Sequence, residues 1–111
     1  MSGEEEEEGG PLRELLDVDR TIHEPARLAI LAHLMAVESA DFLYLRRVTG
    51  LTAGNISSHL SRLEEQGLVG VKKEFQGRRP RTLVRLSAAG RRALQRYVRT
   101  MASALEVIGI E

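Results

Sequence analysis

The clearest alternation of apolar and polar positions lies in residues 51–68. Three apolar residues recur there at i, i+4 and i+7, a spacing that places them on one narrow face of a helix. They are Ile56, Leu60 and Leu63. Thr52 is suited to cap the start of this helix, and Gly67 is suited to end it in the left-handed conformation. The pattern therefore predicts one helix over about residues 52–66.

The opposite face of this predicted helix is polar and consists mostly of small side chains. Its members are Gly54, Asn55, Ser58, Ser61, Arg62 and Glu65. Asn, Ser and Gly are poor or mediocre helix formers, so propensity alone does not account for them. Short donors and acceptors suit a helix that presses against base edges in the major groove of DNA. The same pattern also fits an ordinary serine-rich amphipathic helix.

Three shorter apolar patterns precede this helix. Residues 12–22 predict a first helix that must dock either on the domain or on a second subunit. Pro25 suits the first turn of a second helix, which is mostly apolar and is expected to end near Ser39. A third helix is expected over residues 41–48, followed by a tight turn at residues 49–51. Helix, glycine-containing turn and polar-faced helix make a helix-turn-helix signature, which by itself has many false positives.

A two-stranded ribbon is predicted directly after Gly67. Residues 68–75 and 81–86 are rich in β-branched or alternating residues, and residues 76–80 contain the Gly and Pro of a turn. The tip of this ribbon carries Arg78, Arg79 and Arg81, and its outgoing strand carries Lys72 and Lys73. Planar guanidinium groups can contact phosphates or enter a narrow minor groove. The alternative is a hairpin whose charges only keep it soluble.

A long last helix is predicted from its cap at Ser87 onward. Its apolar residues repeat at spacings of about three to four, and the stripe is longer than a small domain can shield. We therefore expect a two-fold symmetric homodimer, formed mainly by the first and last helices. The expected interface residues are Leu15, Leu16, Leu94, Tyr97, Val98, Met101, Leu105 and Ile108.

Charge is segregated along the chain although the 111 residues have a net charge of zero. Residues 1–51 contain 5 basic and 11 acidic residues, a balance of −6, and residues 52–111 contain 11 basic and 5 acidic residues, a balance of +6. Such asymmetry favours a surface for a polyanion. Residues 1–11 include a glutamate block without apolar residues and are expected to form a disordered acidic tail. Residues 12–111 are expected to form one domain.

Composition argues against several other classes of protein. The chain has no cysteine, no apolar run of the roughly 20 residues that span a membrane, and no signal-like N-terminus, so a cytoplasmic protein is expected. The histidines His23, His33 and His59 lack the spacing of metal ligands. No nucleophile motif, phosphate loop or pair of catalytic carboxylates is recognisable. We expect no enzyme activity, no cofactor, no metal and no membrane partner.

The order of these elements resembles winged helix-turn-helix regulators of the MarR/ArsR type, and it is most similar to their short, single-domain members. Two segments carry the resemblance best when taken together. They are Leu63-Glu-Glu-Gln-Gly-Leu-Val69 and Leu86-Ser-Ala-Ala-Gly90. Residues 23–31 and 51–60 match as well, and the resemblance covers about residues 17–98. It implies a mostly α fold with a small β-hairpin wing (α+β).

The resemblance also implies a function, namely sequence-selective binding of double-stranded DNA by a homodimer on a roughly palindromic operator, as a repressor. The residues expected to face DNA are Thr52, Asn55, Ser57, Ser58, Ser61 and Arg62 in the helix, and Lys72, Arg78, Arg79 and Arg81 in the wing. Two departures from the family pattern matter. The chain is too short to promise the effector pocket of longer MarR proteins, and it lacks the cysteines of ArsR metal sensors. A small-molecule effector is therefore left open. The rival reading is a winged-helix adaptor that binds proteins.

Overall fold

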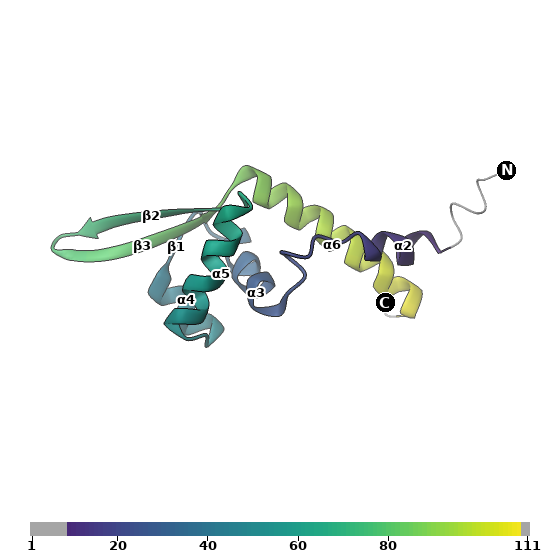
Figure 1. The fold of residues 1–111 in the computed structure, drawn as a ribbon, viewed down its shortest axis with the longest axis horizontal. Coiled ribbons are helices and arrows are strands. Elements are labelled where there is room, and N and C mark those ends of the chain that lie inside the picture. The colour runs from purple at the N-terminus through teal and green to yellow at the C-terminus, as the bar shows by residue number, and fades with distance from the viewer. Residues whose placement is uncertain (1–8, 110–111) are drawn as a thin grey trace.

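Residues 9–109 are described by a computed structural model of the chain, which has five helices and three strands in that range (Figure 1). In chain order they are α2 (Gly10–Leu16), α3 (Pro25–Met35), β1 (Ala40–Asp41), α4 (Phe42–Thr49), α5 (Ala53–Glu65), β2 (Val69–Gln76), β3 (Arg79–Leu86) and α6 (Ala88–Ile108). The predicted α+β fold, helices with a hairpin wing, is confirmed.

The molecule is elongated, with extents of 66 × 23 × 22 Å. The hairpin of β2 and β3 projects at one end, α3, α4 and α5 gather in the middle, and the far half of α6 lies with α2 at the other end (Figure 1). Helices, sheet and the first half of α6 share one core. Its fully buried side chains are Ile22, Ile30, Leu31, Leu34, Leu45, Ile56, Leu63 and Val84.

Helix α5 has the ends and the buried face that its sequence predicts. The Thr52 hydroxyl accepts a hydrogen bond from the Asn55 backbone N–H at 3.1 Å. Gly67 is left-handed at φ 72°, and the Leu68 N–H donates to the Leu63 carbonyl at 3.0 Å, which closes the helix in a Schellman motif. The three apolar residues of the predicted stripe are buried. Both predictions, the capped helix and its inner face, are confirmed.

The end of α5 and the start of α6 meet in a close backbone contact, here called the α5–α6 joint, formed by Gly67, Leu68, Ser87 and Gly90. The Ser87 hydroxyl accepts from the Gly90 N–H at 2.8 Å and donates to the Gly67 carbonyl at 2.6 Å. The Ser87 N–H donates to the Leu68 carbonyl at 3.0 Å. A Cβ atom on Gly90 would lie 2.0 Å from that carbonyl oxygen, so only glycine fits.

The sheet is antiparallel and its strand order is β1-β3-β2, one strand more than the predicted ribbon. The predicted five-residue turn is also wrong, because Gly77 and Arg78 alone connect the strands, with Gln76 paired to Arg79. Gly77 has φ 65°, which a two-residue hairpin turn requires at its first position. Pro80 therefore lies within β3. It is tolerated there because β1 pairs only with residues 83 and 84, which leaves the other side of Pro80 open.

Two helices are shorter than predicted. Helix α2 ends at Leu16 rather than continuing to residue 22, because the Asp19 carboxylate accepts from the N–H groups of Thr21 and Ile22 and turns the chain. Helix α3 ends at Met35 rather than near Ser39. Residues 36–39 must turn so that β1 can pair with β3.

The predicted acidic tail lies outside the described residues except at its end. Gly10 and Pro11, which were assigned to the tail, begin α2, and Pro11 lies in its first turn. Of the helices within residues 9–109, none combines the length and the apolar character needed to cross a membrane.

Helix α6 begins inside the core and leaves it toward its C-terminus. Leu94 and Tyr97 are 3% and 7% exposed in the single chain, so their surface is already taken up by the domain. Burial raises the pKa of Tyr97, and its hydroxyl lies 2.9 Å from His23 Nδ1, which ties α6 to the segment before α3. Farther along, α2 packs on α6. Of the residues expected in a dimer interface, those that remain well exposed are Leu16, Val98, Leu105 and Ile108.

Replacing Gly90 tests the α5–α6 joint. Gly90→Ala is expected to lower the free energy of unfolding by at least about 2 kcal/mol, because the new methyl group overlaps the Leu68 carbonyl. The measurement is urea unfolding at a fixed protein concentration. Gly54→Ala is the matched control, since nothing lies within 4 Å of its added Cβ and alanine favours a helix by about 0.5–1 kcal/mol. Equal stability of the two variants would contradict the close contact.

Candidate nucleic-acid interface

The outer face of α5 carries the polar residues singled out from the sequence, and the structure exposes all of them. They are Thr52, Asn55, Ser57, Ser58, Ser61 and Arg62. Their exposure follows from the burial of the opposite stripe, which fixes the rotation of the helix about its axis. The helix therefore offers a row of short donors and acceptors, with one long cation near its end.

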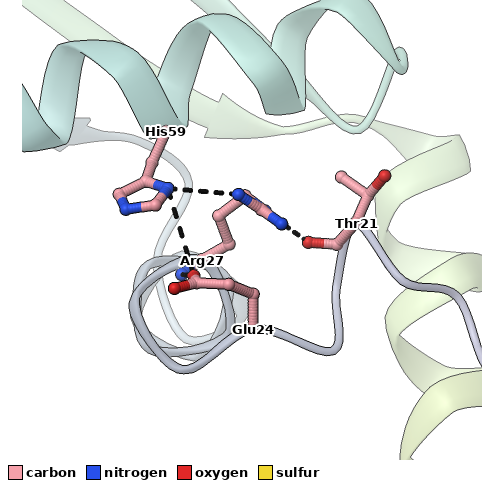
Figure 2. Close-up of polar contacts among 4 residues, drawn as sticks. All are labelled: Thr21, Glu24, Arg27 and His59. Carbon is pink, nitrogen blue, oxygen red and sulfur yellow. Dashed lines mark hydrogen bonds and ion pairs between the residues drawn. The ribbon is translucent and has the colours of Figure 1, made fainter.

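A polar cluster of four residues attaches the flank of α5 to the start of α3 (Figure 2). Arg27 Nη1 donates to His59 Nδ1 at 3.3 Å, and Arg27 Nε donates to the Thr21 carbonyl at 2.6 Å. The Glu24 carboxylate caps α3 by accepting from the Arg27 N–H at 2.7 Å, and it lies 4.0 Å from His59 Nδ1. His59 is thus directed toward the protein, and it belongs to the support of α5 rather than to its exposed face.

The wing, residues 69–86, has two different faces because side chains alternate along a strand. The face that shares its side with α5, here called the inner face, carries the cross-strand pairs Val71–Val84, Lys73–Thr82 and Phe75–Pro80. Val84 is buried, and Lys73 and Thr82 line a hollow of about 390 Å³ together with Ser57 and Ser61 of α5. The outer face carries Lys72–Leu83, Glu74–Arg81 and Gln76–Arg79.

Glu74 offsets part of the positive charge on the outer face of the wing. Arg81 Nε donates to Glu74 Oε2 at 2.8 Å, and Lys72 Nζ lies 3.7 Å from Glu74 Oε1. The hydrogen bond from Arg81 lowers the pKa of Glu74, which keeps the carboxylate ionised. Lys72 and Arg81, both expected to face DNA, therefore share one acidic partner on the side away from α5. Arg78 and Arg79 are exposed at the tip.

Three cations near this surface were left out of the predicted contact set. Lys73 lies on the inner face, and the alternation from Val71 would have placed it there once the register was known. Arg46 and Arg47 are exposed at the end of α4 and line a shallow hollow of about 380 Å³ with Gly50 and Thr52, at the start of α5. The sequence feature that could have identified them is the pair of adjacent arginines in the last turn before the helix-turn-helix connection.

The described part of the chain offers no candidate metal site. Across residues 9–109 there is no group of three or more His, Cys, Asp or Glu side chains that could hold a metal ion.

Comparison with known proteins agrees with this geometry. Residues 26–105 match the family model of the winged helix DNA-binding domain. A transcriptional regulator homologue from Pyrococcus horikoshii superposes with a TM-score of 0.83 at 29% identity, over 91% of this chain and 99% of that one. An uncharacterized protein of Methanocaldococcus jannaschii is 39% identical over 72 residues, which make up 65% of this chain and 78% of that protein.

A mutant MarR from E. coli, solved in complex with operator DNA, shares the fold with a TM-score of 0.64 at 20% identity. That superposition covers 73% of this chain and 57% of the MarR chain. The chain belongs to the winged helix DNA-binding domain family. It shares its fold with the MarR chain and with the Pyrococcus horikoshii regulator homologue.

Removing the negative charge of Glu74, which pairs with Lys72 and Arg81, should strengthen non-specific DNA binding. Glu74→Gln removes the negative charge that Arg81 and Lys72 share, so we expect tighter binding to a random-sequence duplex at low salt. The slope of log K against log salt should steepen by about 1 if one freed cation reaches a phosphate. Fluorescence anisotropy at several salt concentrations measures both. Glu106→Gln, the same change on α6, is the charge-matched control. Equal slopes for the two variants would contradict the inference that Glu74 offsets the charge of Lys72 and Arg81.

Proposed function

We propose that this protein is a MarR-type transcriptional regulator that binds a roughly palindromic operator in double-stranded DNA as a homodimer and represses transcription by occupying it. The observation that carries the proposal is the outer face of α5, where small polar side chains and Arg62 are exposed at the base of a wing with a cationic tip. The family supplies DNA binding, and the face supplies the residues to read a sequence.

In this proposal α5 enters the major groove. Asn55 and Arg62 are the base readers, because Asn pairs its amide with adenine and Arg pairs its guanidinium with guanine in two-point contacts. Ser57, Ser58 and Ser61 contact phosphates or read bases through water. Thr52 caps α5. The N-terminal end of the helix, with its partial positive charge, faces the phosphates of the DNA backbone in this proposal.

The wing acts on the DNA beside the site that α5 reads. Arg78 and Arg79 at the tip set the affinity and its salt dependence. Lys73 adds a cation on the inner face, whereas Lys72 and Arg81 contribute less because Glu74 offsets their charge. The two faces of the wing therefore contribute differently to DNA binding.

Dimerisation is proposed to use the end of the molecule opposite the wing. Six exposed large apolar residues lie on α2 and on the second half of α6, which pack together. They are Leu12, Leu16, Val98, Leu105, Val107 and Ile108. A two-fold axis through this end would place the two α5 helices on one side of the DNA. Half-sites about 34 Å apart, one helical turn, would then match the symmetry of the protein.

Regulation is the role that the comparisons favour over an adaptor. The Pyrococcus horikoshii protein, aligned over 99% of its length, is described as a transcriptional regulator homologue, and the MarR structure holds operator DNA. An adaptor helix would expose apolar anchors. The exposed face of α5 carries Asn, Ser and Arg instead.

Charges placed in the proposed dimer contact should dissociate the protein. Leu16 and Ile108 are both 70% exposed and each ends a helix, where lysine is compatible with the helix dipole. Leu16→Lys/Ile108→Lys should therefore keep its fold, shown by circular dichroism, and sediment as a monomer where the wild type sediments as a dimer. Leu43→Lys, an exposed apolar residue of α4, is the control. A wild type that is monomeric at all concentrations would contradict the proposal.

Removing the guanine reader should abolish sequence selection. A preferred duplex is first selected from a random library by the wild-type protein, and its two-fold symmetry is read from the selected sequences. Arg62→Ala should lose about 1–3 kcal/mol of binding free energy on that duplex, and much less on a scrambled one. Arg99→Ala on α6 controls for the loss of one positive charge. Equal losses on both duplexes would assign Arg62 to the phosphates, and no enrichment of any sequence would favour the adaptor.

A further inference from the structure

Phe75 is an exposed aromatic residue of the wing that lies outside the proposed DNA contacts. Phe75 is 72% exposed, the highest value among the large apolar residues of the described chain. It stands opposite Pro80 on the inner face, two residues beyond the Lys73–Thr82 pair. An exposed Phe–Pro pair contributes nothing to the core, and it has a cost in solubility on a strand edge.

We infer that Phe75 and Pro80 form an apolar contact to DNA, in which they pack against the deoxyribose wall of the minor groove that the wing tip enters. The inference rests on the proposed function, and it assigns part of the binding to apolar contact rather than to charge.

The position of the pair supports this contact. Phe75 lies four residues beyond Val71, the half-buried residue at the wing base, which is about 13 Å at the rise of a β-strand. It shares the inner face with Lys73, whose side chain borders the same hollow as Ser57 and Ser61 of α5. A duplex seated along α5 and the inner face of the wing would pass Phe75 as it leaves the helix.

The charge around the pair identifies the polymer. Lys73 precedes Phe75 on the same face, and Arg78 and Arg79 follow at the tip. Interfaces between proteins are depleted of charge at their apolar centre, whereas interfaces with DNA are strongly positive. The two-residue turn at Gly77 and Arg78 keeps the tip narrow, as a groove about 6 Å wide requires. Sugars are the uncharged part of the DNA backbone, and they line the walls of the groove whose floor the arginines reach.

The pair also borders a hollow that a protein could fill. Phe75 and Pro80 line a space of about 530 Å³ with Phe42 and Leu43 at the start of α4. A protein ligand in this hollow is the competing explanation for an exposed Phe75, and the experiment must separate the two.

Salt-dependent binding to the selected duplex separates apolar contact from charge. Phe75→Ala is expected to weaken binding about 5-fold or more at every salt concentration, with the slope of log K against log salt unchanged. Phe75→Lys is the sharper variant. If the wing supplies charge alone, the added cation should tighten binding and steepen the slope, whereas the inferred contact predicts that binding extrapolated to 1 M salt is weaker than for the wild type.

Hydroxyl-radical footprinting of the same complexes reports on the sugars directly. The wild type should protect deoxyriboses in the minor groove beside each half-site, and Phe75→Ala should lose that protection while the half-sites stay protected. Val37→Ala, which truncates an exposed apolar residue in the turn after α3, is the control and should match the wild type.

Each outcome decides the inference. Unchanged affinity and footprint in Phe75→Ala, with a wild type that binds the duplex, would overturn it and assign the hollow beside α4 to a protein. Tighter binding by Phe75→Lys at all salt concentrations would overturn it in favour of charge alone. A wild type that binds no duplex would overturn the proposed function and this inference together.

Discussion

The fold depends on one close approach between backbones, at the α5–α6 joint. Gly90 lies against the Leu68 carbonyl because it has no side chain, and Ser87 uses its hydroxyl twice, as a cap for α6 and as a donor to Gly67. This contact fixes how the end of α5, the start of β2 and the start of α6 are oriented relative to one another. A change in the angle between them would move the wing and the far end of the molecule relative to the helix that faces DNA.

The joint also gives a physical reason for the two sequence segments that carried the resemblance. Gly67 and Leu68 near the end of the first segment are 20 and 22 residues from Ser87 and Gly90 of the second, and they contact each other in the structure. Together the two segments specify the close contact between the end of α5 and the start of α6. This is why the combination is informative while each segment alone matches many unrelated helix ends and helix starts.

Sequence reasoning was accurate where a local signal determines the structure. The caps at Thr52 and Ser87, the left-handed Gly67 and the buried stripe of α5 all depend on neighbours within one or two turns. It failed where distant partners decide. Strand β1 exists only because Ala40 and Asp41 meet β3, and that pairing also ends α3 early.

The candidate site shows the same limit. Exposure of the α5 residues could be predicted from helical periodicity, but the division of the wing cations could not. Which of Lys72 and Lys73 shares a face with α5 depends on the register, and the two-residue turn that sets the register was predicted as five residues. The pairing of Arg81 with Glu74 follows from that register as well. In the last helix, Leu94 and Tyr97 have the same spacing as the exposed apolar residues, and only the packed structure assigns them to the core.

The alternation of the wing constrains how its length can vary in related chains. Inserting one residue into β2 between Val71 and the turn would exchange the two faces beyond that point, turning Glu74 toward α5 and Phe75 away from it. A wing that keeps Lys73 and Phe75 on the face toward the recognition helix can therefore change length between Val71 and Phe75 only by two residues in each strand at a time. Among homologues, the lengths of this hairpin should differ in steps of four residues. The two-residue turn favours the same parity, because it closes on a hydrogen-bonded pair and such pairs alternate along the strands.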